Sequence, residues 1–121
     1  MTEEWLGLPG GEARLLASGD LGGCSIMELT TAPNEGPPSH IHSREDEGFV
    51  VLDGTYRFNV ADREIDAQAG SFVLGPRGRP HTYRAGATGG HLIIVLAPGV
   101  SNDSSRSGLP LSLTGRLVMD S

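Results

Sequence analysis

Apolar residues occur in short runs along most of the chain, and turn-forming residues separate each run from the next. The clearest runs are 25–30, 48–52, 55–60 and 91–96, with shorter ones at 71–75 and 81–84. They are rich in β-branched and aromatic residues, and "TYRFNV" alternates with period two. Strand-like runs repeating every 8–12 residues or so are typical of an all-β sandwich or barrel. The pattern therefore predicts short antiparallel strands and no long helix.

Two stretches carry more specific local predictions. The Asp53-Gly54 pair in "LDGT" favours a type I′ hairpin turn, because both central residues of that turn need a left-handed backbone. Residues 10–20 could hold a single helical turn around Glu12–Ala17, although glycines flank it. We therefore expect a hairpin at the first stretch and at most one turn of helix at the second.

Residues 101–121 differ in composition from the rest of the chain. "SNDSSRSG" (101–108) is typical of a flexible loop. Leu109, Leu111 and Leu113 then alternate with other residues, as in an edge strand. Such a strand can pair with a second subunit or fold back over its own barrel, and the sequence leaves both open. We expect residues 1–121 to form one domain and the protein to be a homodimer.

Composition and charge exclude several partners. The net charge is -6, and the nine basic residues are all arginines scattered along the chain, which argues against nucleic acid or anionic membrane as a partner. No apolar run approaches the roughly 18 residues of a membrane span. The first residues lack the pattern of an export signal, so we expect a cytoplasmic protein. The single cysteine, Cys24, excludes an internal disulfide.

His40 and His42 in "PPSHIHSREDEGFVVLDG" (37–54) are two positions apart, so in a strand they share one face. Two imidazoles on one face can converge on a single metal ion. A carboxylate from the following acidic cluster can join them. Glu47 is preferred because it leads directly into the apolar run, whereas the alternatives Glu45 and Asp46 belong to the polar "SRED" segment, which is typical of an exposed loop.

A second cluster, "GSFVLGPRGRPH" (70–81), presents a third histidine after a turn rich in glycine and proline. The two clusters together resemble the paired motifs of the cupin superfamily. The first motif, at 36–54, matches at Gly36, His40, His42, Glu47 and Gly54. The second motif, at 70–85, matches at Gly70, Pro76, Gly78 and His81. The chain departs from the family pattern at Asn34, where a leading glycine is usual, and at Ala85, which replaces the closing asparagine.

The resemblance covers roughly residues 14–99 and is strongest to small single-domain cupins (monocupins) related to quercetin dioxygenases. It implies a cupin-type double-stranded β-helix, a jelly-roll barrel of two antiparallel sheets. It also implies one divalent transition-metal ion bound by His40, His42, Glu47 and His81. Glu47 is then either a permanent ligand or a general base.

This ligand set does not by itself distinguish Fe, Mn, Ni, Cu and Zn. Strand alternation places Phe49 and Val51 on the face of Glu47, and Tyr83 on the face of His81. Glu47 and Tyr83 are the candidate catalytic residues, with Tyr83 orienting a substrate oxygen. We expect a dioxygenase acting on a small aromatic or polyketide-like substrate. Two alternatives stay open: a Lewis-acid isomerase, cyclase or decarboxylase, and a non-catalytic small-ligand-binding cupin.

Overall fold

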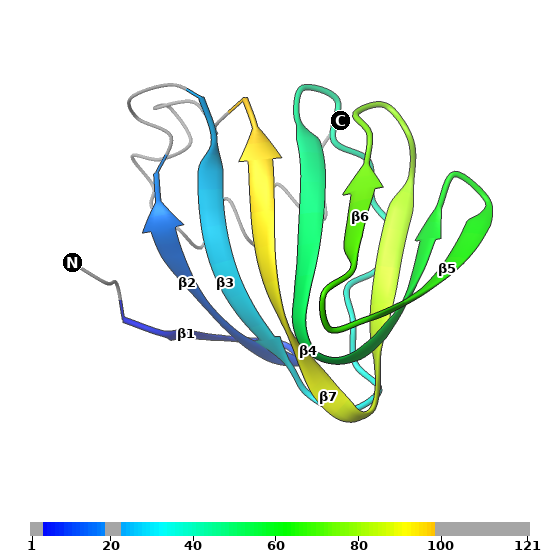
Figure 1. Ribbon diagram of the computed structural model, residues 1–121. Helices are drawn as coiled ribbons and strands as arrows, with labels where there is room; N and C mark the ends of the chain where they lie inside the picture. Colours follow the sequence, from blue (N-terminus) through cyan, green and yellow to red (C-terminus); the bar gives the residue numbers. More distant parts are fainter. Residues whose placement is uncertain (1–3, 19–22, 99–121) are drawn as a thin grey trace.

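The computed structural model describes residues 4–18 and 23–98, and this part of the chain forms seven β-strands and no α-helix (Figure 1). The strands are β1 (Leu6–Leu8), β2 (Gly11–Ala17), β3 (Ser25–Thr31), β4 (Asp46–Val60), β5 (Arg63–Gln68), β6 (Phe72–Gly75) and β7 (His81–Ala97). Every pair of neighbouring strands is antiparallel. None of the described segments is a helix long and apolar enough to cross a membrane. The predicted all-β class is confirmed, and the predicted strand at 109–113 lies outside the described residues.

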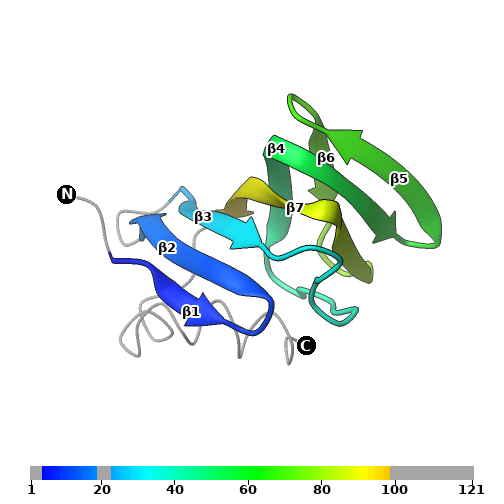
Figure 2. The ribbon, with the colours of Figure 1, turned by 90° about the horizontal axis from the view of Figure 1, so that it is seen from below.

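The two longest strands, β4 and β7, pair with each other and take part in both layers of the barrel. Their pairing register shifts at Val51/Asp53 and again at Gly54/Tyr56, and the sheet bends there, at the bottom of Figure 1. One layer contains β1, β2, β3 and β6 with the adjoining halves of β4 and β7. The other contains β5 with the remaining halves (Figure 2). This is the expected jelly-roll barrel, in which the two sheets share β4 and β7.

The hairpin turn predicted at Asp53-Gly54 is wrong. Asp53-Gly54 is not a hairpin turn, because β4 continues through both residues to Val60. Gly54 does have a left-handed backbone, with φ of 79°, and a Cβ there would lie 2.2 Å from the Gly89 carbonyl oxygen of β7. The same left-handed preference suits a bulge as well as a turn, and pairing with β7 selects the bulge. The actual turn lies at Ala61-Asp62, both with positive φ, between β4 and β5.

The helical turn that the sequence allowed around Glu12–Ala17 does not form. Residues 11–17 are not helical but form β2, which pairs with β1 and β3. An isolated helical turn has too few hydrogen bonds to be stable in water. The strand instead satisfies its backbone groups through both neighbours, and Ala13 packs in the core.

The core lies between the two layers and is built from alternate residues of each strand. In β3, for example, Met27 and Leu29 are buried, while Ile26, Glu28 and Thr30 are partly exposed. Four aromatic residues fill the middle of the barrel, with ring centroids 5.0–6.0 Å apart in the contacting pairs: Phe49, Tyr56, Phe58 and Tyr83. The interior next to β4 and the first half of β7 is therefore closely packed.

Candidate metal centre

His40 and His42 lie in the segment between β3 and β4, and backbone hydrogen bonds join this segment to the second motif. The His40 and His81 amides each donate to the other residue's carbonyl, at 3.0 and 2.9 Å. The Gly78 amide donates to the His42 carbonyl at 2.7 Å. The two sequence motifs are therefore one local structure, with His40 and His81 opposite each other in a β-bridge.

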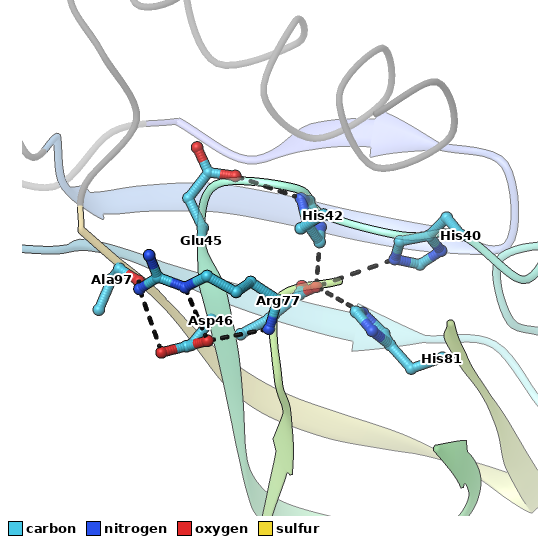
Figure 3. Close-up of polar contacts among 8 residues, drawn as sticks. His40, His42, Glu45, Asp46, Arg77, His81 and Ala97 are labelled. Atoms are coloured by element: carbon cyan, nitrogen blue, oxygen red, sulfur yellow. Dashed lines mark hydrogen bonds and ion pairs between the residues drawn. The ribbon is translucent and has the colours of Figure 1, made fainter. Parts of the chain in front are cut away.

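Glu47, the second residue of β4, completes the cluster. Its Oε1 atom lies 2.8 Å from His81 Nε2, 2.9 Å from His42 Nε2 and 3.8 Å from His40 Nε2. Figure 3 shows the three imidazoles turned toward a common centre. One ligand atom from each of the four residues lies within 4.8 Å of the others, and none of the four residues is more than 5% exposed. The structure therefore brings together all four residues that the motifs predict as ligands.

The orientation of His40 shows that the centre suits a cation. His40 Nδ1 lies 2.8 Å from the Pro38 carbonyl oxygen, which can only accept, so Nδ1 carries the proton. In the neutral ring, Nε2 then presents a lone pair toward the Glu47 carboxylate, and this buried atom has no hydrogen-bond partner among the described residues. A lone pair facing a carboxylate is unfavourable unless a positive charge lies between them. Three imidazoles and one carboxylate fit a divalent first-row ion.

The electrostatics of Glu47 support the same conclusion. Burial by itself raises the pKa of Glu47, but the close contacts of its carboxylate with His81 Nε2 at 2.8 Å and His42 Nε2 at 2.9 Å outweigh burial and hold the pKa well below its ordinary value of 4.5. The carboxylate is therefore ionised at neutral pH. An ionised carboxylate can act as a metal ligand or as a general base.

The two alternative carboxylates lie outside the centre. Glu45 is buried on the far side of His42, with its Oε1 atom 3.5 Å from His42 Nδ1 (Figure 3). Asp46 accepts hydrogen bonds from the Arg77 amide at 2.9 Å and from its guanidinium at 3.2 and 3.3 Å. These bonds lower the pKa of Asp46. They also connect the turn between β6 and β7, which contains Arg77, to the first residue of β4.

The residues expected to line a pocket belong to the core. Phe49 and Val51 are essentially inaccessible to solvent, and Phe49 packs against the His81 ring at a centroid distance of 5.7 Å. Tyr83 is also buried, two residues beyond His81. Burial, and then the negative charge of Glu47, raise the pKa of Tyr83 well above its ordinary value, so the phenol keeps its proton.

Sequence reasoning missed two groups that hold the centre in place. One is the Pro38 carbonyl, which sets the tautomer of His40. Every residue has a backbone carbonyl, so the sequence does not show which carbonyl will bind a histidine ring. The second missed group is the side chain of Arg77, which the sequence could have indicated. It lies inside the second motif, where an arginine beside Pro76 could have been paired with the acidic cluster at the start of β4.

Comparisons with known proteins agree with this geometry. A sequence model of the family described as "Cupin domain" matches residues 27–97, more than half of the chain. A search of curated proteins gives no match.

Among solved structures, KdgF from Halomonas sp. superposes with a TM-score of 0.74 at 16% identity, covering 81% of this chain and 88% of that one. A single-residue variant of Bacillus subtilis oxalate decarboxylase superposes with a TM-score of 0.72 at 24% identity. That match covers 85% of this chain but only 29% of the decarboxylase. Oxalate decarboxylase from Bacillus subtilis contains Mn(II) centres. At these identities the likeness shows the fold. With the family match, the paired motifs and the converging histidines, the chain belongs to the cupin family.

Proposed function

We propose that the protein is a metal-dependent enzyme that acts on a small organic molecule. The observation that carries the proposal is the convergence of three imidazole Nε2 atoms on a buried, ionised carboxylate, with the His40 lone pair turned toward that carboxylate. A divalent transition-metal ion bound by His40, His42, Glu47 and His81 would supply Lewis-acid polarisation of a substrate oxygen.

The side chains around this centre have separate roles in the proposal. Glu47, when not coordinated, accepts a proton from a substrate hydroxyl or enol, because its carboxylate is ionised. Tyr83 retains its phenol proton and can donate a hydrogen bond to a substrate oxygen. Phe49 packs against the His81 ring and Tyr83 packs against Phe49, so the phenol lies in the aromatic cluster beside the centre. A small molecule with two neighbouring oxygens suits this arrangement.

The first version of the proposal is a dioxygenase that cleaves an enol, catechol or β-diketone. It is supported by the resemblance of the two motifs to those of quercetin dioxygenase-like cupins. Glu47 deprotonates the substrate and Tyr83 orients it, and O₂ is consumed in proportion to product.

The second version is a reaction without O₂, such as isomerisation, cyclisation or decarboxylation. The donor set is compatible with it, because three imidazoles and one carboxylate accept zinc as readily as redox-active ions. One structural neighbour, oxalate decarboxylase, is also named for a decarboxylation.

Elemental analysis and oxygen uptake test these versions. Protein purified without chelators should contain about one transition-metal ion per chain. An oxygen electrode is then run with flavonols, catechols, β-diketones and, as the comparison suggests, oxalate. Oxygen uptake with product supports the dioxygenase, and turnover without uptake supports the second version. Tight binding of these compounds without turnover would indicate a binding protein, and an absence of metal would contradict the whole proposal.

A Glu47→Gln variant tests the role of the carboxylate, with Glu64→Gln on the exposed face of β5 as the matched control. Loss of turnover by about 10²-fold or more with retained metal indicates a base, and loss of metal indicates a ligand. Full turnover with full metal content in Glu47→Gln would contradict both roles. The control should behave as the parent protein does.

We further propose that residues 1–121 form a single domain and that the chain is a homodimer. Light scattering coupled to size exclusion tests this proposal. A mass near 25 kDa would be expected, which is twice the chain mass of 12.7 kDa. A single-chain mass at micromolar concentration would contradict it.

A further inference from the structure

Gly75 occupies an unusual place beside the centre. It is the last residue of β6 and pairs directly with Glu47 of β4. It is buried and faces into the barrel, as its alternation with the exposed Phe72 and Leu74 shows. A side chain at this position would therefore point toward the cluster of imidazoles.

The space that such a side chain would need is already taken by His81. A Cβ atom built on Gly75 would lie 2.9 Å from His81 Nδ1 and 3.1 Å from both Cε1 and Cγ. Ordinary van der Waals contact begins at about 3.4 Å, so the ring would have to move by roughly half an ångström. The imidazole of His81 packs directly against the bare backbone of Gly75.

The ring has little freedom to move elsewhere. On its other sides it contacts Phe49 and the rings of His40 and His42, with centroid distances of 5.7, 4.5 and 5.7 Å. The backbone of His81 is held by the two hydrogen bonds to His40. A displacement of the ring therefore moves Nε2 relative to Glu47 Oε1.

We infer that Gly75 is a positioning residue for the metal centre: its missing side chain forms the slot that holds the His81 imidazole with Nε2 aimed at Glu47. The inference rests on the proposed function, because it treats His81 as a metal ligand. Metal–ligand distances tolerate only about ±0.2 Å, which is less than the shift that a Cβ atom imposes. Replacing a residue that orients a metal ligand typically weakens metal affinity about 10–100-fold.

The requirement for glycine here is steric and not conformational. The backbone of Gly75 is not left-handed, so alanine can adopt the same backbone angles. This makes Gly75→Ala a clean test. Gly48→Ala is the matched control, because Gly48 follows Glu47 in β4 on the opposite face of the sheet, where a Cβ would lie 2.8 Å from the ring of Phe72, which is exposed and can turn away.

The first measurement is Zn²⁺ affinity of the full chain, by competition with a chromogenic chelator. Gly75→Ala should bind Zn²⁺ about 10–100-fold more weakly than the parent, and Gly48→Ala within about threefold of it. The same pair is then compared in a His81→Ala background, where Gly75→Ala should have no further effect, because the ring that it displaces is gone. An equal loss in both backgrounds, or parental affinity of Gly75→Ala, would overturn the inference.

A second measurement does not depend on metal. In the metal-free protein, ¹⁵N spectra of the imidazoles should show His81 shifted by Gly75→Ala, with His91 on the outer face unchanged. If Gly75→Ala fails to fold, folding of the double variant with His81→Ala supports the slot, and failure of both contradicts it. If the parent protein binds no Zn²⁺, the proposed function is overturned and the positioning role with it. If the parent protein binds Zn²⁺ and Gly75→Ala binds it with the same affinity, only the inference about Gly75 is overturned.

Discussion

Phe49 supports both the barrel interior and the metal centre, and replacing it tests whether this packing is as tight as the structure indicates. Its side chain is fully buried, and its ring contacts Phe58, Tyr83 and His81 at centroid distances of 5.0, 5.4 and 5.7 Å. Phe49→Ala removes this ring and leaves a cavity that rigid strands on all sides cannot close. The expected loss in the free energy of unfolding is about 4 kcal/mol, within the range of about 3–5 kcal/mol for such substitutions.

Phe72 provides a matched control, because it is the same residue type in a neighbouring strand but lies on the exposed face. Phe72 is 61% exposed on the outer face of β6 and pairs with Val50, the neighbour of Phe49. With more than half of its surface in water, Phe72→Ala should cost only about 1 kcal/mol. Because both variants replace phenylalanine with alanine, the difference between their losses in the free energy of unfolding measures the effect of burial.

Urea denaturation in the presence of a chelator measures both variants without a contribution from bound metal. For a domain of this size, the loss in Phe49→Ala corresponds to a decrease in Tm of roughly 12–20 °C. Equal losses in the two variants would refute the reasoning, because they would mean either that Phe49 is not packed as described or that Phe72 is covered in solution.

The remaining predictions concern metal, a buried phenol and an ion pair. Metal at about 100 times its dissociation constant should stabilise the protein by about 2.7 kcal/mol, and a chelator should remove this gain in a thermal melt. Tyr56→Phe deletes the buried hydrogen bond to Thr31 Oγ1 and should cost about 1 kcal/mol by urea denaturation. Burial raises the pKa of the Tyr56 phenol from 10.0 to about 12. Between pH 10 and about pH 12 the phenol is therefore ionised in the unfolded chain but protonated in the folded one, so the free energy of unfolding falls as pH rises. Tyr56→Phe should reduce this dependence of stability on pH. Because Arg77 lowers the pKa of Asp46, the stability that their contact contributes is lost as pH falls below 3.8, and Asp46→Asn should show a flatter acid melting profile.

The site was more predictable than the strands that carry it. His40 and His42 converge as strand alternation predicted, although they lie between β3 and β4, where only the bridge of His40 to His81 is strand-like, and the motif describes the turn at Pro76 and Gly78 that precedes His81. Local backbone preference was less informative. It identified a left-handed glycine at position 54 correctly but not the bulge that it forms, because a turn and a bulge require the same φ.

The amino-acid sequence by itself determined the all-β class and the positions of most apolar strands, since alternation and turn chemistry act between near neighbours, and the resemblance of its two motifs to those of cupins identified the four residues that converge. Only the tertiary structure decided that β4 and β7 run through the bend, that Pro38 fixes the ring of His40, and that Gly75 leaves room for His81. These last features depend on contacts between segments distant along the chain, and neither a backbone carbonyl nor a missing side chain leaves a pattern in the residues themselves.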